Sequence, residues 1–269
     1  MNQPLLTRIQ RKAWRIADRT RLRLFPSRFS QWPCLERKRL VVGCESSGTT
    51  IIAKSLFGKG RLRFLIEGQQ SWVWDARSRI FQGLASFEDY PHLRLFDTWK
   101  VPGFAPVLPQ LRTSYPNCAT VYVVRNPRDV VASAFRTFQI TSRDEFSKIP
   151  WVQANWLGIK EMDPFARLAM RWRIYLEQSA KVDRVHYVRY EDFCDNKVET
   201  IRHLAEFLDL KIDLGFVRSI CNQQASNRSA RSYPPQGPNS WQSVPAISAA
   251  DIEKVEQICG PHLAAWGYE

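Results

Sequence analysis

The segment from Leu40 to Leu56 limits the possible folds of this chain more than any other. An apolar run stops at Gly43, a short polar loop follows up to Gly48, and Thr49 opens a stretch with helical spacing of apolar residues. A strand, a glycine-bounded loop and a helix in this order bring free backbone N–H groups and the positive end of the helix dipole to one point. The segment therefore predicts an anion site at the end of a buried strand, the alternative being an ordinary strand-to-helix turn.

The residues of this loop decide which anion it fits. A nucleotide triphosphatase loop reads G-x-x-x-x-G-K-[ST]; Gly43 and Gly48 have that spacing, but Thr49 stands where the lysine is expected. A kinase or ATPase without this lysine lacks the main positive charge on the γ-phosphate. A P-loop kinase or nucleotide triphosphatase is therefore an alternative interpretation and not the first one. The loop and helix start offer four hydroxyl donors: Ser46, Ser47, Thr49 and Thr50.

Strand and helix patterns alternate along the rest of the chain. Apolar and β-branched runs indicate strands at residues 40–43, 63–66, 93–99, 120–124 and 184–190. Periodic apolar positions indicate helices at residues 49–56, 109–115, 127–138, 164–181, 197–208 and 249–259, the last ended by Gly260-Pro261. We expect residues 139–162 to form a lid or substrate-facing insertion and residues 222–245 a loop. This alternation predicts an α/β fold with a central parallel β-sheet flanked by helices.

Three candidate binding segments each follow a predicted strand: Gly43–Thr50, Lys100 and Arg125. In open parallel sheets ligands bind at the carboxyl ends of the strands, so these segments should share one edge. The residue after Arg125 is Asn126, a good N-cap for the following helix. An arginine at a strand end can hold a phosphate through two parallel hydrogen bonds. The alternative is that Arg125 pairs with a carboxylate such as Asp129.

The composition is that of a globular protein. The 269 residues are 44% hydrophobic and 24% charged, which suits one large α/β domain. We expect that domain over residues 36–269, preceded by a basic amphipathic helix and linker over residues 1–35. The sequence contains no apolar run of membrane-spanning length. Its scattered cysteines and the lack of a secretory signal favour a cytoplasmic protein, and the histidines have no metal-ligand spacing, so no metal is expected.

The positive charge is concentrated near the N-terminus. The net charge is +13, and residues 1–40 contain 11 Lys/Arg against 2 Asp/Glu. A basic amphipathic helix over residues 1–25 can rest on anionic lipid or dock its apolar stripe on the domain, and the two interpretations stay open. The first would place the protein peripherally at the inner face of the membrane. Because the excess charge is one terminal segment, the body of the chain is not expected to bind nucleic acid.

The chain resembles the sulfotransferases that use 3′-phosphoadenosine 5′-phosphosulfate (PAPS), and two segments carry most of the resemblance. Residues 46–50 (SSGTT) are similar to that family's 5′-phosphosulfate loop, whose usual core is Lys/Arg-Ser-Gly-Thr-Thr. Residues 123–133 (VVRNPRDVVAS) are similar to its 3′-phosphate block. In that block an arginine and a serine eight positions later bind the 3′-phosphate, and Arg125 and Ser133 have this spacing.

Two later segments extend the resemblance, which runs from about Leu40 to Tyr268. Residues 187–191 (YVRYE) resemble the strand whose tyrosine, here Tyr190, approaches the adenine; residues 231–241 (RSYPPQGPNSW) resemble a basic loop that closes over the nucleotide. The resemblance implies a P-loop-like sulfotransferase fold and PAPS as co-substrate. The residues implied in its binding are Ser46, Ser47, Gly48, Thr49, Thr50, Arg125, Ser133, Tyr190 and Arg231.

The sequence departs from the family pattern in three places. Ser46 stands where lysine or arginine is common, so positive charge at the sulfuryl group must come from elsewhere. Lys100 is the candidate, because in the family a lysine after the third strand often serves this end of the cofactor. The cytosolic branch has a catalytic histidine just after its lysine, and this chain has none. It therefore looks closer to the carbohydrate-type sulfotransferases than to the cytosolic small-molecule type. The late loop is longer than the common form.

The expected activity is transfer of a sulfuryl group to an acceptor hydroxyl on a glycan or glycolipid, with Glu67 as general base. Glu67 follows a predicted strand, and several glycan-directed sulfotransferases use a glutamate; a plain surface carboxylate is the alternative. Further candidates for the base are Asp75, His92 and Asp97. Aromatic rings that could stack on an acceptor or fill the core are Trp72, Trp74, Trp151 and Trp156. A non-catalytic nucleotide-binding member of the same fold remains a third interpretation.

Overall fold

The computed structural model describes residues 37–58, 64–67, 72–149, 152, 155–161, 163–226 and 240–268. The predicted N-terminal helix and linker over residues 1–35 lie outside the described residues, so the division into two parts stays a prediction. Arg231 and Trp151 also lie outside them.

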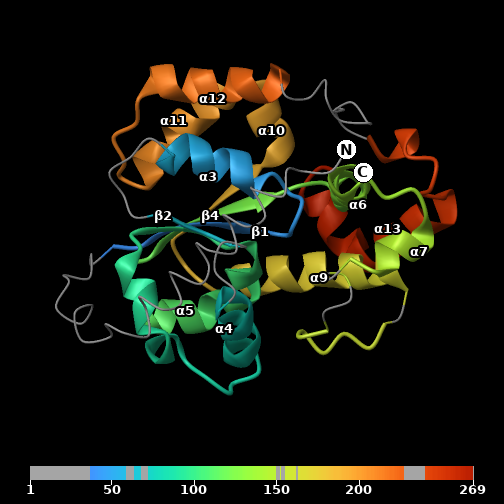
Figure 1. The fold of residues 1–269 in the computed structure, drawn as a ribbon, viewed down its shortest axis with the longest axis horizontal. Coiled ribbons are helices and arrows are strands. Elements are labelled where there is room, and N and C mark those ends of the chain that lie inside the picture. The colour runs from blue at the N-terminus through green and yellow to red at the C-terminus, as the bar shows by residue number, and fades with distance from the viewer. Residues whose placement is uncertain are drawn as a thin grey trace, which may run out of the picture.

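A single parallel sheet organises the described chain (Figure 1). Its five strands are β1 (Arg39–Gly43), β2 (Phe64–Ile66), β3 (Thr98–Lys100), β4 (Ala119–Val124) and β5 (Val185–Arg189), in the order β2-β3-β1-β4-β5. Every neighbouring pair is parallel. Because β1 is the central strand, the loop that follows it opens in the middle of the carboxyl edge of the sheet. The predicted parallel α/β fold is confirmed.

Two hydrophobic cores cover the two faces of the sheet, and the strands alternate between them. On β1, Leu40 and Val42 pack into one core, and Val41 packs into the other. The first core includes residues of the helices α4 (Trp72–Phe81), α9 (Pro164–Ser179) and α13 (Ala249–Ala265), and the second those of α3 (Thr49–Phe57), α11 (Lys197–Phe207) and α12 (Leu214–Ser226). Figure 1 shows α3, α11 and α12 on one side of the strands and α4, α5 (Leu108–Ser114) and α9 on the other. Successive side chains of a strand point to opposite faces of the sheet, so a strand covered on both faces needs apolar residues at every position.

The helices connect and cover the strands. Their bounds are α3 (Thr49–Phe57), α4 (Trp72–Phe81), α5 (Leu108–Ser114), α6 (Pro127–Phe138), α7 (Arg143–Ser147), α9 (Pro164–Ser179), α10 (Tyr190–Asp195), α11 (Lys197–Phe207), α12 (Leu214–Ser226) and α13 (Ala249–Ala265). Short 3-10 helices are η1 (Phe87–Asp89), η2 (Pro91–Leu95), η3 (Pro102–Val107) and η5 (Ser240–Ser243). The predicted cap is present, since Asn126 accepts from the N–H of Arg128. Ser248 and Asp251 form a capping box at the start of α13.

Three predicted elements differ from the structure. The strand expected over residues 93–99 is shorter, because Pro91 starts the 3-10 helix η2 and only Thr98–Lys100 pair as β3. Residues 222–245 are not all loop, since α12 reaches Ser226 and η5 begins at Ser240. The final helix does not stop at Gly260: α13 continues through Pro261 to Ala265, with Leu263 buried beyond the proline. Core packing there outweighs the one backbone hydrogen bond that proline removes.

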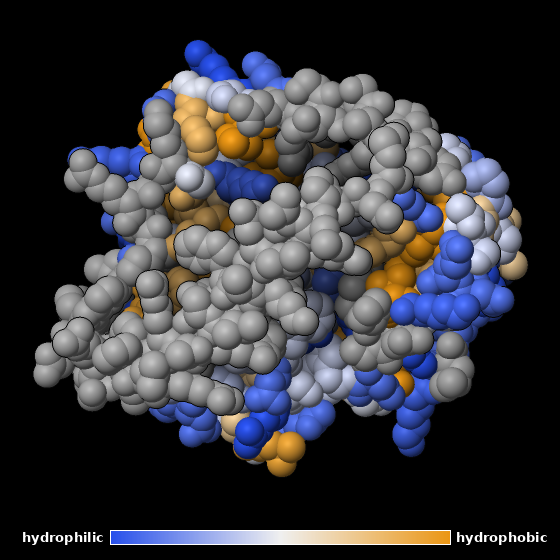
Figure 2. Space-filling model, viewed as in Figure 1, coloured by the Kyte–Doolittle hydropathy of each residue, from blue (hydrophilic) through white to orange (hydrophobic). Residues whose placement is uncertain are grey.

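On the face drawn in Figure 2, most of the described residues at the margin of the molecule are hydrophilic. Among the described residues the exposed large hydrophobic side chains are Leu84, Phe138 and Leu214, and they come from separate elements. No described helix is both long and apolar enough to cross a membrane.

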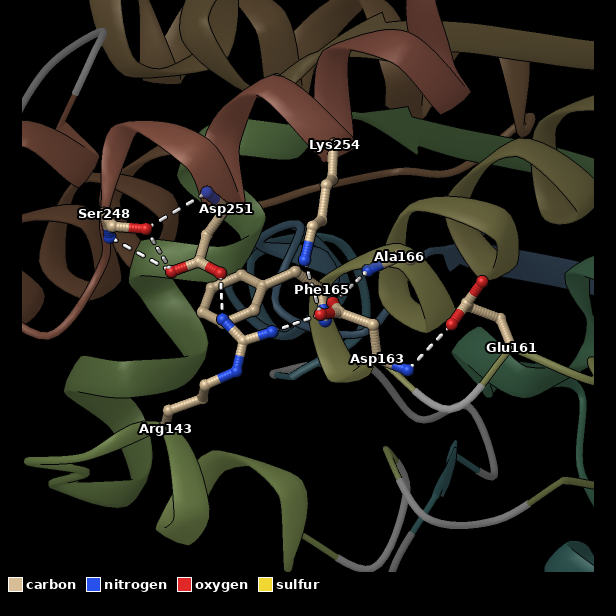
Figure 3. Close-up of polar contacts among 8 residues, drawn as sticks. All are labelled: Arg143, Glu161, Asp163, Phe165, Ala166, Ser248, Asp251 and Lys254. Carbon is tan, nitrogen blue, oxygen red and sulfur yellow. Dashed lines mark hydrogen bonds and ion pairs between the residues drawn. The ribbon is translucent and has the colours of Figure 1, made fainter.

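An ion-pair network joins α7, α9 and α13 (Figure 3). Arg143 donates to Asp163 and to Asp251, and Lys254 donates to Asp163 at 2.8 Å. Asp163 also caps α9, accepting from the N–H groups of Phe165 and Ala166 at 3.0 and 3.1 Å. Burial alone would raise the pKa of Asp163, but these hydrogen bonds and the charges of Arg143 and Lys254 hold it below its usual value. Asp163 therefore fixes the end of the insertion to the body of the domain.

Replacing Asp163 should destabilise the domain, because Asp163→Ala removes a helix cap and two ion-pair partners. We expect the free energy of unfolding at pH 7 to fall by about 1–2 kcal/mol, measured by urea denaturation. Since its folded-state pKa is lowered, the contribution of the carboxylate is present above its unfolded pKa of about 3.8 and is lost as the pH falls through the folded value. Glu206→Ala, which removes an exposed partner of Arg202, is the control and should cost less than about 0.5 kcal/mol.

Candidate active site

The loop after β1 has the backbone of an anion cradle. Ser46 and Gly48 adopt left-handed conformations with φ of 69° and 88°, and Gly48 is the N-cap of α3 without a side-chain cap. The first turn of α3 contains no acidic residue, so the positive end of its dipole is not neutralised locally. The hydroxyl of Ser47 is fully buried and has no hydrogen-bond partner among the described residues. An anion at this helix start would satisfy these donors.

Arg125 reaches this loop from the end of β4. Its Nη1 donates to the carbonyl oxygen of Ser46 at 2.9 Å, and its guanidinium lies 4.5 Å from the ring centroid of Tyr190. Trp172 Nε1 donates to the carbonyl oxygen of Arg125 at 3.0 Å and fixes the backbone from which the side chain extends. The Nε of Arg125 is buried without a partner in the described part of the chain. The arginine is thus placed by neutral groups and keeps donor capacity for an anion.

Tyr190 closes the cradle. A Cβ added to Gly48 would overlap the Tyr190 ring, so only glycine allows this approach. Gly48 also has a positive φ, which other residues adopt at a cost. The loop, Arg125 and Tyr190 therefore form one unit, although they come from segments far apart in the sequence.

Ser133 lies on the face of α6 that a later segment covers. Asp129, Ser133 and Arg136 are spaced to share one side of the helix. Ser240 donates to Asp129 at 2.7 Å, and Arg136 donates to the Ser240 hydroxyl at 2.7 Å. Burial and the neighbouring charge of Arg125 lower the pKa of Arg136. This face therefore brings a second arginine, which the sequence motif did not indicate, toward Arg125.

Glu67 and Lys100 lie side by side at the carboxyl ends of β2 and β3. The N–H of Glu67 donates to the carbonyl oxygen of Lys100 at 2.9 Å. Glu67 Oε1 is 3.1 Å from Nη1 of Arg77, and the same nitrogen is 3.5 Å from Oε1 of Glu45. Tyr175 donates to Glu45 at 3.2 Å. We use the name charge cluster for a set of six residues: Glu45, Glu67, Arg77, Lys100, Arg171 and Tyr175.

Burial is the largest influence on the pKa values of Glu67 and Lys100. Burial and the charge of Glu45 raise the pKa of Glu67 to about 7, against the opposing effects of Arg77 and Lys100. Burial also lowers the pKa of Lys100, although the carboxylates of Glu67 and Glu45 work in the other direction. A carboxylate with a pKa near neutrality can take up and release a proton at physiological pH, as general-base catalysis requires.

The other candidate bases lie elsewhere. Asp75 is exposed and accepts a hydrogen bond from Tyr90 at 3.2 Å. Asp97 precedes β3, so it lies at the amino end of the strand whose carboxyl end is Lys100. The side chain of His92 lies outside what the structure describes. Glu67, in contrast, directly follows β2 at the carboxyl edge of the sheet.

The tryptophans divide between core and site. Trp156 is buried and packs edge-on against Phe81. Trp74 is half-buried, with Arg77 over its ring. One face of each ring is therefore in contact with the protein itself. Of the cradle threonines, Thr49 is buried and Thr50 is exposed.

Sequence reasoning located the loop, Arg125, Tyr190 and the Glu67–Lys100 neighbourhood, and the structure brings each group together. It missed Glu45, Arg77, Arg171, Tyr175 and Arg136. Glu45 lies inside the loop that was singled out, so its position alone could have indicated it. Among the described residues no group of three or more His, Cys, Asp or Glu side chains is arranged to hold a metal ion.

These features define an α/β protein with a loop suited to an anion at the carboxyl edge of its parallel sheet. Residues 66–213, more than half of the chain, match the model of the sulfotransferase family. The chain belongs to this family, as its resemblance in sequence predicted. The matched range includes Glu67, Lys100, Arg125 and Tyr190 but not the loop after β1.

Named relatives agree with the family. Human carbohydrate sulfotransferase 2 is 26% identical over an alignment of 231 residues that covers 70% of this chain and 42% of that protein. The chain thus spans less than half the length of this relative. The structure of sulfotransferase STF9 from Mycobacterium avium aligns with a TM-score of 0.58 and 12% identity, covering 93% of this chain and 81% of that one. The structure of mouse sulfotransferase SULT7A1, complexed with PAP, aligns with a TM-score of 0.52 and 13% identity, covering 88% of this chain and 88% of that one. At these identities the structures show the shared fold.

The cradle predicts that Gly48→Ala weakens anion binding, because the new Cβ meets the Tyr190 ring at a positive φ. We expect affinity for inorganic pyrophosphate, measured by calorimetry, to fall roughly tenfold or more, which corresponds to about 1.4 kcal/mol. Gly83→Ala is the matched control: its φ is 71°, but a Cβ there meets nothing within 4 Å. Equal losses in both variants would mean that backbone strain alone is responsible and that the Tyr190 contact does not shape the site.

Proposed function

We propose that this protein transfers a sulfuryl group from PAPS to a hydroxyl of a carbohydrate acceptor. The observation that carries the proposal is the position of Arg125. This residue directly follows β4, and its side chain reaches the loop that follows the adjacent strand β1. Two anion-binding groups thereby meet at one edge of the sheet, which suits a nucleotide with charged groups on both its 3′ and 5′ positions. Membership of the sulfotransferase family supports this interpretation.

The residues present fit such a nucleotide. The loop N–H groups, the buried hydroxyl of Ser47 and Thr49 would hold the 5′-phosphosulfate, and Arg125 and Ser133 the 3′-phosphate. Tyr190, stacked on Arg125, offers a ring to the adenine. When bound, PAPS supplies an activated sulfuryl group. The further contributions of Ser46, Thr50 and Arg231 stay predictions.

The charge cluster suits the transfer itself. Glu67 takes the proton of the acceptor hydroxyl as that oxygen forms its bond to sulfur, and the bond between sulfur and the nucleotide oxygen breaks. Lys100, beside Glu67, stabilises the negative charge that grows on the departing nucleotide oxygen. Lys100 thereby supplies the positive charge that a lysine or arginine at position 46 would give. Adenosine 3′,5′-bisphosphate is released, and the proton on Glu67 returns to solvent.

A carbohydrate acceptor is supported by two observations. The relative named above is a carbohydrate sulfotransferase, although its identity to this chain is only 26%. No histidine stands just after Lys100, which is followed by Val101 and Pro102, whereas the cytosolic small-molecule branch has one just after its lysine. A glycan or glycolipid acceptor, contact of residues 1–25 with anionic lipid, and a cytoplasmic location are parts of the same proposal.

Two other functions compete with it. A P-loop kinase or nucleotide triphosphatase would need a charge at the position that Thr49 occupies. A non-catalytic nucleotide-binding protein of the same fold would keep Arg125 and Tyr190 but would have no use for a carboxylate like Glu67, whose pKa lies near 7. The position of Glu67 beside Lys100 at the strand ends, together with its raised pKa and the family match, therefore favours the enzyme.

Arg125→Ala tests the cofactor. We expect the wild type to bind adenosine 3′,5′-bisphosphate far more tightly than AMP or ATP in a calorimetric titration, because Arg125 recognises the 3′-phosphate. The variant should lose at least about 2 kcal/mol of this preference, and the exposed-helix control Arg202→Ala should retain it. A wild type that prefers ATP, or a preference that survives in Arg125→Ala, would rule out the proposed cofactor.

Glu67→Gln tests the general base. We expect transfer of radioactive sulfate from PAPS to fall by about 10²–10⁴-fold, since a positioned base contributes this much, while affinity for adenosine 3′,5′-bisphosphate is retained. In the wild type, kcat/KM should rise with pH and reach half its maximum near pH 7, because the base acts only when deprotonated. Glu253→Gln, at an exposed position of α13, is the control.

The same assay distinguishes acceptors when neutral oligosaccharides are compared with small phenols. We expect radioactive sulfate to be transferred to the oligosaccharides and not to the phenols. The reverse would move the protein to the small-molecule type, and retained activity in Glu67→Gln would show that another group takes the proton.

A further inference from the structure

The guanidinium of Arg77, on helix α4, is buried and lies against two tryptophan rings. Its side chain is 2% exposed. Its guanidinium carbon lies 3.9 Å from the ring centroid of Trp74 and 4.7 Å from that of Trp156. Trp74 belongs to the same helix, but Trp156 comes from the insertion between α7 and α9. Two indole rings from distant segments therefore fix the plane of one cation.

Gly103 leaves the space in which this cation meets Glu67. A Cβ at Gly103 would overlap Nη1 of Arg77 and would lie 2.8 Å from its Cδ and 3.1 Å from Oε1 of Glu67. Gly103 belongs to η3, three residues after Lys100. Its φ is not in the left-handed region, so the backbone here would accept alanine. The glycine is thus explained by the approach of Arg77 and Glu67.

We propose that Arg77 is a positioning residue of the transfer site: held by Trp74 and Trp156, it grips Glu67 and fixes its orientation beside Lys100. The proposal rests on the proposed function, in which Glu67 is the general base. One nitrogen, Nη1, serves both Glu67 at 3.1 Å and Glu45 at 3.5 Å. Glu45 takes part in this arrangement, because it shares the Nη1 donor of Arg77 with Glu67 and places a like charge near it.

The charged groups that face Glu67 act in opposite directions. Arg77 from α4 and Lys100 from β3 favour its ionised form, as does the N–H of Gly103 from η3. Glu45 from the loop after β1 favours its protonated form. Arg171 and Tyr175 of α9 approach Glu45 at 3.8 and 3.2 Å. Removing Arg77 or Glu45 should therefore move the titration of Glu67 in opposite directions.

A network with only a structural role would not behave in this way. Breaking a buried ion pair destabilises a protein strongly whichever partner is lost. A general loosening of the cluster would let water reach Glu67 and lower its proton affinity in every variant. If the pKa of Glu67 moves up when Arg77 is perturbed and down when Glu45 is replaced, the two residues act on Glu67 itself. A purely structural role would move the pKa in the same direction in both variants.

The experiment is a carboxyl ¹³C NMR titration of the full chain labelled at glutamate, with the Glu67 resonance assigned by its loss in Glu67→Gln. Gly103→Ala displaces Arg77 without changing any charge, and we expect it to raise the midpoint of Glu67 by about 1 pH unit or more. Glu45→Gln should lower the midpoint by a similar amount. Gly260→Ala, where a Cβ in α13 meets nothing within 4 Å, is the matched control and should leave the midpoint unchanged.

Transfer assays complete the test. Gly103→Ala should reduce kcat at pH 7 tenfold or more, with KM for PAPS and affinity for adenosine 3′,5′-bisphosphate within twofold of wild type, and should regain activity at higher pH. Arg77→Lys, which keeps the charge but loses the planar group between the indoles, should behave in the same way and replaces Gly103→Ala if that variant does not fold.

Midpoints that do not move, or that move in the same direction in Gly103→Ala and Glu45→Gln, would overturn the role of Arg77. Failure of the proposed function has a different signature. The wild type would then bind no adenosine 3′,5′-bisphosphate and transfer no sulfate, whatever the titration of Glu67 shows.

Discussion

The hydrogen bond from Arg125 to the carbonyl oxygen of Ser46 joins the ends of β4 and β1, and the cradle depends on it. Arg125 is only 7% exposed, and its described contacts are a carbonyl oxygen and the ring of Tyr190. A buried cation held by neutral groups is costly unless an anion completes its environment. The left-handed loop and the uncapped start of α3 aim further donors at the same place. The fold thus gathers at this edge the preorganised donors that the proposed anion site requires.

The strands that build this edge were predictable because their signal is local. β1 and β4 are short apolar runs buried on both faces, and the Asn126 cap marks where β4 gives way to α6. The third strand was placed too early, because the apolar residues before it enter a 3-10 helix that starts at Pro91. The last helix was ended too soon, since a Gly-Pro pair stops most helices, whereas packing carries α13 past it.

The site was predictable only where it follows a motif. The loop and Arg125 each stand directly after a strand, so the rule for parallel sheets brought them together. Arg77 has no such mark, because an arginine on an amphipathic helix ordinarily faces solvent. It is buried because Trp156, 79 positions later in the chain, covers it, and Gly103 leaves room for it. Such a contact is a property of the tertiary structure, and no spacing in the sequence encodes it.

The charge cluster cannot be explained by stability. Buried ion pairs lose most of their Coulombic gain to desolvation, and apolar residues of the same volume are often equally stable. The two carboxylates are also not equivalent. Glu45 is approached by Arg77, Arg171 and Tyr175, whereas Glu67 lies beside Arg77 and Lys100 at the strand ends. In the proposed mechanism, Glu45 is thus the anchored countercharge and Glu67 is the carboxylate that exchanges a proton. A cluster of this asymmetry is expected where a proton must move.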